Sequence, residues 1–217
     1  MSEFASRRVM MVDTQVRPSD VTKFPIIDAL LTVRRESFVP NSLREAAYVG
    51  ENLPLGPARV MLEARTLAKL LDALDIQPGE LVLDLGCGLG YSAAVIARLA
   101  ETVVAVEEDE ALAAEAQRLL SEEGVDNAVV VAGPLAAGSV KCAPYDVITV
   151  EGGVEVVPDT ILAQLAEGGR IGAVFMDGPV GTARIGYKTS GHVTWRPVFN
   201  ASAPVLPGFE AARSFVL

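Results

Sequence analysis

Three glycines at alternate positions stand between an apolar run and a helical pattern. Gly86, Gly88 and Gly90 follow the run 81–85, and an alanine-rich helical pattern begins at Tyr91. Glycine lets the backbone turn sharply and approach a ligand, and the start of a helix presents unpaired N–H groups to an electron-rich group. This context predicts a nucleotide-binding loop, although its G-x-G-x-G spacing differs from the G-x-G-x-x-G of dinucleotide enzymes.

A carboxylate ends the next apolar run. Residues 102–106 have the composition of a buried strand, and Glu107 follows them, seventeen residues after Gly90. A carboxylate at the tip of the second strand of such a unit can accept hydrogen bonds from both hydroxyls of a ribose. The strand, glycine turn, helix and acid together predict a site for a nucleoside-bearing ligand. The alternative is a unit whose glycines only make a tight turn.

The elements that must position these residues alternate along the chain. Periodicity predicts helices at 66–75 and 109–123, and further strands at 127–132, 145–150 and 171–175. Two alternating runs then flank Thr189-Ser190-Gly191 and predict an antiparallel hairpin, at 182–188 and 192–199. We therefore predict an α/β fold in three layers: a seven-stranded, mostly parallel sheet with antiparallel C-terminal strands and helices on both faces.

The first 58 residues have a different pattern. Apolar residues at helical spacing predict two short helices, which Arg17-Pro18-Ser19-Asp20 separates. We predict that residues 1–58 form a helical cap over the C-terminal edge of the strands. Residues 59–217 would form the ligand-binding domain, and both parts would belong to one structural domain.

Composition limits the partners. The chain has 217 residues, of which 50% are hydrophobic and 21% charged, as expected for a globular α/β protein. A formal net charge of −10 opposes a nucleic-acid partner, because such a partner needs a basic face. Cys87 and Cys142 lack metal-ligand spacing, so neither a zinc site nor a disulfide is expected and a cytoplasmic location fits. No stretch has the roughly 18 apolar residues of a membrane span. The oligomeric state is not indicated.

The unit from 81 to 107 resembles the S-adenosylmethionine-binding half of the class I methyltransferases, which have a Rossmann-like fold. The resemblance implies S-adenosyl-L-methionine as cofactor, with its methionine end near Asp84 and the glycine turn. Many relatives have Gly-Asp-Gly after the third strand; here Pro134 removes that carboxylate and one backbone donor. The cofactor-binding residues implied are Asp84, Gly86, Cys87, Gly88, Gly90, Glu107, Glu108, Gly133, Pro134 and Leu135.

Two segments before the glycine turn carry a closer resemblance. Residues 33–40 read Val-Arg-Arg-Glu-Ser-Phe-Val-Pro, and Ala47-Tyr48 and Leu53-Pro54-Leu55-Gly56 follow them. These are similar to the Val-Pro-Arg-Glu-x-Phe-Val-Pro, Ala-Tyr and Leu-Pro-Ile-Gly of the protein-L-isoaspartate O-methyltransferase family. Ala143-Pro144-Tyr145-Asp146 also matches it. The resemblance implies an O-methyltransferase that esterifies isoaspartyl residues in damaged proteins, as a step of protein repair.

The acceptor loop departs from that family. Its Gln-Thr-Ile-Ser-Gln-Pro falls on residues 59–64, so Leu62 stands where the serine should be. If the reaction survives, another donor must replace the serine. Arg59 is the nearest candidate, because a guanidinium can bind a carboxylate bidentately. Glu151 stands at the end of the fourth strand, where the family has a small or hydroxyl residue.

Three functions stay open at this point. The first is methylation of an isoaspartyl carboxylate, which is already ionised at neutral pH and needs no general base. The second is methylation of another, smaller acceptor, with Glu151 as base or anchor, unless Glu151 is only an exposed carboxylate at a strand end. The third is cofactor binding without transfer. Because the serine is lost, we expect isoaspartyl transfer to be weak or absent, and Leu62→Ser to raise it only if the site still fits the peptide.

Overall fold

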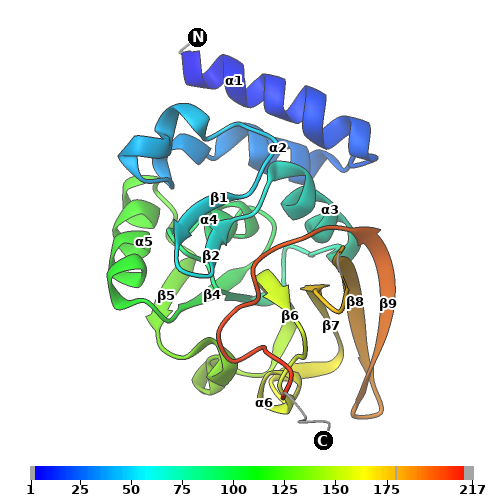
Figure 1. The fold of residues 1–217 in the computed structure, drawn as a ribbon. Helices are drawn as coiled ribbons and strands as arrows, with labels where there is room; N and C mark the ends of the chain where they lie inside the picture. Colours follow the sequence, from blue (N-terminus) through cyan, green and yellow to red (C-terminus); the bar gives the residue numbers. More distant parts are fainter. Residues whose placement is uncertain (1–2, 179, 213–217) are drawn as a thin grey trace, which may run out of the picture.

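The structure is a computed structural model, which describes residues 3–178 and 180–212. Its centre is a seven-stranded sheet in the order β5-β4-β3-β6-β7-β8-β9 (Figure 1). Neighbours from β5 to β7 pair parallel, whereas β7–β8 and β8–β9 pair antiparallel. The strands are β3 Leu81–Leu85, β4 Thr102–Glu107, β5 Ala128–Ala132, β6 Tyr145–Val154, β7 Leu165–Phe175, β8 Thr182–Thr189 and β9 His192–Asn200. The predicted fold is confirmed.

The parallel strands are apolar on both sides because both faces of the sheet are covered. Successive side chains of a strand point to opposite faces, so Val82 and Val103 join one core while Leu83 and Val104 join the other. The first core lies under α2 Phe24–Thr32, α3 Ala64–Leu74, α4 Tyr91–Ile96 and α5 Glu110–Glu122; the second lies under η5 Leu135–Ala137, α6 Asp159–Leu162 and the C-terminal segment around Leu206 and Phe209.

The N-terminal segment is helical, as predicted, and continues into a small hairpin. It contains α1 Glu3–Met11, the π-helix Val12–Val16, α2, and the short helices Arg17–Ser19, Arg35–Ser37 and Asn41–Ala46. The helix α2 packs against α3 and α4, so this segment lies on the helix layer of one face (Figure 1). β1 Leu53–Gly56 then pairs antiparallel with β2 Arg59–Met61. The predicted boundary between residues 58 and 59 therefore falls inside a hairpin.

Buried polar groups hold the N-terminal segment together. Arg8 donates to Glu36 over 3.1 Å and to the Tyr48 hydroxyl over 3.0 Å, and that hydroxyl in turn donates to Glu36. Arg35 is fully buried, donates to the carbonyls of Ala47 and Leu62, and lies over the ring of Tyr91. The motif around Arg35 and Glu36 thus joins the N-terminal helices to the segment that ends at Leu62.

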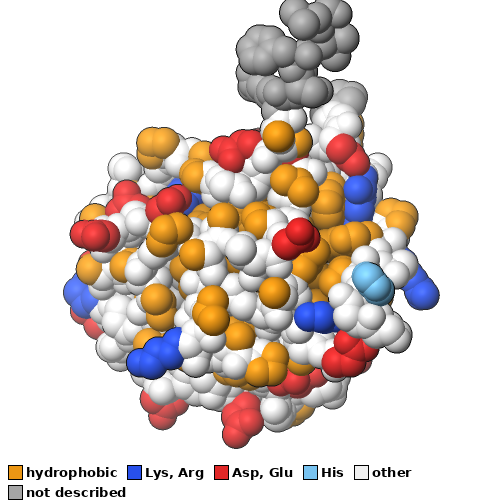
Figure 2. Space-filling view, turned by 90° about the horizontal axis from the view of Figure 1, so that it is seen from below, with side chains coloured by type: hydrophobic (Ala, Val, Ile, Leu, Met, Phe, Trp, Pro, Cys, Tyr) orange, Lys and Arg blue, Asp and Glu red, His pale blue; other side chains and the backbone are white. Residues whose placement is uncertain are grey.

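The surface is mixed in character. On the face seen in Figure 2, Lys and Arg side chains are scattered among acidic and apolar ones. Within the two described ranges, no helix has both the length and the apolar composition to cross a membrane.

Candidate functional site

The glycine turn connects β3 to α4 and is held by backbone hydrogen bonds. The N–H of Gly86 donates to Val106 on the neighbouring strand, and that of Gly90 donates to Cys87, both over 2.8 Å. Gly86, Gly88 and Gly90 all have positive φ, which side-chain-bearing residues rarely adopt. A Cβ on Gly88 would also lie 2.5 Å from the Leu55 side chain of β1. The sequence therefore needs glycine here for conformation and for the close approach of the hairpin.

Asp84 is the buried carboxyl group below this turn. It has no exposed surface, and it accepts hydrogen bonds from the hydroxyls of Ser92, over 2.7 Å, and Thr149, over 3.0 Å. Burial raises the pKa of Asp84 to about 6; the two hydroxyl groups oppose this rise, and the nearby charge of Glu107 adds to it. The two hydroxyl hydrogen bonds favour the ionised form of Asp84. Sequence reasoning missed Ser92 and Thr149, although Ser92 lies in the first turn of the helix after the glycines.

Glu107 ends β4 as predicted, and its carboxylate is surrounded by donors. One oxygen accepts from the Gly88 N–H over 2.9 Å. The other accepts from the backbone N–H groups of Glu108 and Asp109 and from Arg59 Nε, the last over 2.9 Å. These four bonds fix the carboxylate against the glycine turn. Glu108 is exposed and lies 3.5 Å from the Arg59 guanidinium.

The position of Arg59 differs from the expectation. We expected its guanidinium to replace the missing serine as donor to an acceptor carboxylate. Instead it is buried and paired with Glu107, because Arg59 opens β2 and the hairpin folds over the end of β4. In this arrangement Arg59 belongs to the side of the site where the ribose was expected.

Two hollows lie on either side of Leu55. The inner one, between β2, the glycine turn and β6, is lined by Leu62, Tyr91, Ser92 and Glu151 among others, and its free volume of about 10 Å³ scarcely holds a water molecule. The outer one, about 460 Å³, is lined by Leu55, Gly56, Pro57, Arg59, Glu108, Asp109, Ala111, Leu112 and Pro207. Because Leu55 lines both, a ligand that spans them requires the Leu55 side chain to move.

Glu151 is buried in the inner hollow. Only 4% of its surface is exposed, which rules out the exposed strand-end carboxylate considered above: the hairpin strand β2 packs against β6 and covers it. Burial raises the pKa of Glu151 well above its usual range, and the charge of Asp84 raises it further. Its Oε1 has no hydrogen-bond partner within the described residues. An unpartnered buried oxygen of this kind is costly unless a ligand or water completes it.

The segment from Gly133 to Leu135, which the resemblance implied for cofactor binding, follows β5 and begins beside Glu107. The N–H of Gly133 donates to the Glu107 carbonyl over 3.0 Å, because β5 pairs with β4 and ends at the same level. Pro134 is exposed, whereas Leu135 is buried close to Gly86. Leu206 from the C-terminal segment also packs against Gly86, and nothing in the sequence pattern had indicated it.

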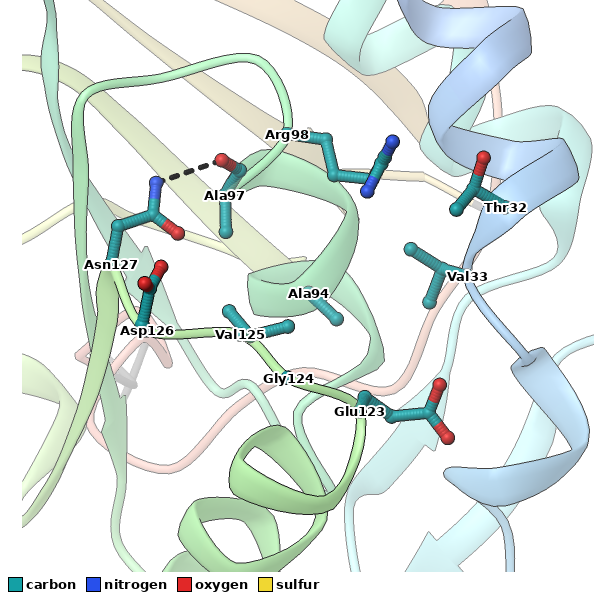
Figure 3. Close-up of a pocket in the computed structure, with 10 residues that line it drawn as sticks. All are labelled: Thr32, Val33, Ala94, Ala97, Arg98, Glu123, Gly124, Val125, Asp126 and Asn127. Carbon is teal, nitrogen blue, oxygen red and sulfur yellow. Dashed lines mark hydrogen bonds between the residues drawn. The ribbon is translucent and has the colours of Figure 1, made fainter.

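A separate surface hollow lies between α2, α4 and the loop before β5 (Figure 3). Two of its polar side chains have partners: Asn127 donates to the Ala97 carbonyl, and Arg98 lies 3.5 Å from Asp28. None of the predicted site residues lines it. The candidate site therefore consists of the inner and outer hollows around Leu55.

Sequence comparisons identify similar proteins. A family model described as protein-L-isoaspartate(D-aspartate) O-methyltransferase matches residues 8–183. A protein-L-isoaspartate O-methyltransferase of Syntrophus aciditrophicus is 34% identical over 171 residues, which cover 79% of this chain and 78% of the relative. Protein-L-isoaspartate O-methyltransferase 1 of Rhodopseudomonas palustris is 36% identical over 170 residues, covering 78% and 69%. The matched range of the family model includes Arg59, Asp84, Glu107 and Glu151.

Comparison with solved structures finds proteins of similar fold. One protein-L-isoaspartate O-methyltransferase superposes with a TM-score of 0.80 and 26% identity, covering 93% of this chain and 66% of the other, so this chain spans about two thirds of that protein. A structure from Plasmodium falciparum, described as a protein-L-isoaspartate O-methyltransferase in complex with S-adenosyl-L-homocysteine, gives a TM-score of 0.78 over 95% of this chain and 99% of that one. At 16% identity, the second likeness shows the fold alone.

Proposed function

Because this chain belongs to the protein-L-isoaspartate O-methyltransferase family, we propose that it transfers a methyl group from S-adenosyl-L-methionine to an isoaspartyl carboxylate of a protein. The observation that carries the proposal is the glycine turn, which lies between two buried carboxyl groups, Asp84 and Glu107, at the carboxyl ends of parallel strands. This is where open α/β sheets bind ligands.

The residues present fit the cofactor. Gly86 and Gly88 carry no side chain that would keep a ligand away from the backbone. The buried carboxylate of Asp84 would bind the ammonium group of the cofactor, and that of Glu107 would bind its ribose hydroxyls. The cofactor supplies an electrophilic methyl group. The chain orients the cofactor and excludes water. The hairpin that carries Leu55 and Arg59 must move aside to admit the cofactor and then close over it.

The charge of Asp84 predicts how cofactor affinity depends on pH. Its pKa in the folded protein, about 6, lies above the usual aspartate value, so the carboxylate gains its charge as pH rises from 5 to 7. We expect the affinity for S-adenosyl-L-homocysteine, measured by calorimetry, to rise roughly tenfold over that interval. In Asp84→Asn, affinity should be low and nearly flat with pH. An affinity of the unaltered protein that does not change between pH 5 and 7 would contradict this role.

Tritiated-methyl transfer tests the acceptor. We expect the protein to label a synthetic isoaspartyl peptide but not its aspartyl twin. Leu62→Ser should raise the rate, because a hydroxyl beside the acceptor contributes about 0.5–1.5 kcal/mol, or up to about tenfold. Leu62→Ala is the matched control, since it makes the same space without a donor. Equal labelling of the two peptides would refute the proposed acceptor.

A second candidate function is methylation of an acceptor that bears N–H or O–H. The observation that favours it is the buried carboxyl of Glu151, because an ionised Glu151 would repel a carboxylate and accept a hydrogen bond from an amine or alcohol. The cytoplasmic location predicted from the cysteines stays a prediction.

A further inference from the structure

The strand β6 bulges at the position of Glu151. Thr149 pairs with Gly172 of β7, and Gly153 pairs with Val174, so β6 advances four residues, from 149 to 153, while β7 advances two, from 172 to 174. Such a bulge re-aims side chains beside active sites. Here it accompanies a glutamate that lines the inner hollow. The two glycines that follow, Gly152 and Gly153, are packed so closely that a Cβ would lie 2.5 Å from a neighbour, so the bulge itself is tightly held.

Glu151 lines the same hollow as Leu62, which stands where the family's hydroxyl is missing. Leu62 comes to this hollow from the end of β2 and Glu151 from β6. Within the described residues, a few buried side-chain nitrogen and oxygen atoms have no hydrogen-bond partner. Glu151 Oε1 is the only one of them that belongs to a carboxyl group. A polar group with an unmet hydrogen bond thus lies in the same small space as the leucine that replaced a donor.

The charges around Glu151 favour its neutral form. Asp84 on β3 keeps the negative charge, because it accepts two hydroxyl hydrogen bonds. The charge of Glu107 on β4 is offset by Arg59, and burial raises the pKa of the Cys87 thiol, which stays neutral. A hydrogen bond from Thr149 would favour an ionised Glu151, but the single hydroxyl hydrogen of Thr149 is already donated to Asp84. When two buried carboxyl groups lie close together, the group with more donors ionises and the other holds the proton.

We propose that Glu151, as a carboxylic acid, is the hydrogen-bond donor of the acceptor site and replaces the serine hydroxyl that Leu62 has displaced. This inference rests on the proposed function. The acid holds one oxygen of the isoaspartyl carboxylate. The other oxygen forms the new bond to the methyl carbon while the methyl–sulfur bond breaks and its electron pair stays on sulfur. Glu151 keeps its proton throughout, and the product is a neutral ester.

Two substitutions separate donation from other roles. Glu151→Gln keeps an N–H donor of the same shape, whereas Glu151→Ala has none. With the isoaspartyl peptide, we expect Ala to lower kcat/KM by about ten- to a hundredfold, as the loss of a hydrogen bond to a charged group predicts, and Gln to retain most of it. Leu62→Ser should restore activity to Glu151→Ala. Binding of the peptide to the S-adenosyl-L-homocysteine complex, followed by fluorescence anisotropy, should weaken in Ala and persist in Gln.

The pH dependence of the reaction provides a second test, which does not depend on the Glu151→Ala variant folding correctly. The kcat/KM of the unaltered protein should fall as the pH rises through the raised pKa of Glu151, and that fall should be absent in Glu151→Gln. S-adenosyl-L-homocysteine affinity and thermal melting serve as controls for the fold.

The outcomes distinguish this inference from the function on which it rests. If the unaltered protein does not label the isoaspartyl peptide, the proposed acceptor fails and the inference with it. If it does label the peptide but Glu151→Ala is as active, only the role of Glu151 is overturned. A Gln variant as inactive as Ala, in a protein that methylates an amine or alcohol, would show that Glu151 is a base instead.

Discussion

Glu36→Ala is expected to lower the free energy of unfolding by about 3–5 kcal/mol, because it leaves the Arg8 guanidinium buried without its counterion. The side chains of Arg8 and Glu36 are only 10% and 6% exposed, and Tyr48 donates to the same carboxylate. The loss should affect α1, α2 and the segment that ends at the hairpin, because these residues join them. Urea denaturation at neutral pH, with tryptophan fluorescence and circular dichroism as probes, measures it.

The same helix provides a matched control. Arg7, next to Arg8, pairs with Glu45, whose side chain is 78% exposed. Exposed pairs contribute little, so Glu45→Ala should change the unfolding free energy by no more than about 1 kcal/mol. A double substitution, Arg8→Met with Glu36→Leu, should recover much of the stability lost in Glu36→Ala, since it removes the uncompensated charge. Equal losses for Glu36→Ala and Glu45→Ala would show that the buried pair does not hold the N-terminal segment.

The places of Asp84, the glycine turn and Glu107 in the fold could be predicted from the sequence because their signal is local. The run 81–85, the three glycines and Glu107 lie within one strand–helix–strand unit, where the order of residues nearly determines their place. The sheet followed from the same kind of pattern. The strands are apolar throughout where both faces are covered, and they alternate in the two C-terminal runs.

The acceptor side could not be predicted in the same way. The partner of Arg59 lies 48 residues away, and the hairpin that brings them together has a turn of only two residues, Pro57-Ala58, where the sequence indicated a domain boundary. The burial of Glu151 depends on that hairpin and on the register shift between β6 and β7. Gly152 and Gly153 are compatible with a bulge but do not fix its register, so Glu151 after the apolar run was equally compatible with an exposed carboxylate.

Glu107→Gln is expected to weaken S-adenosyl-L-homocysteine binding by about 1.5–3 kcal/mol, or roughly ten- to over a hundredfold, because the ribose hydroxyls lose a charged acceptor. Gln is chosen over Ala because its carbonyl oxygen can still accept the Gly88 N–H, which holds the glycine turn. Calorimetry at pH 7 measures the affinity, and thermal melting checks that the fold survives.

The control for Glu107→Gln lies one residue away. Glu108 follows the end of β4 and is within 3.5 Å of the same guanidinium, but its side chain is 41% exposed and makes no bond to the glycine turn. Removal of the Glu108 charge in Glu108→Gln should weaken the binding free energy of S-adenosyl-L-homocysteine by less than about 1 kcal/mol. If the two variants bind S-adenosyl-L-homocysteine equally, Glu107 serves the hairpin through Arg59 and not the ligand. A large loss confined to Glu107 means instead that Arg59 yields its place on the carboxylate when the ribose enters, since four donors already surround those two oxygens.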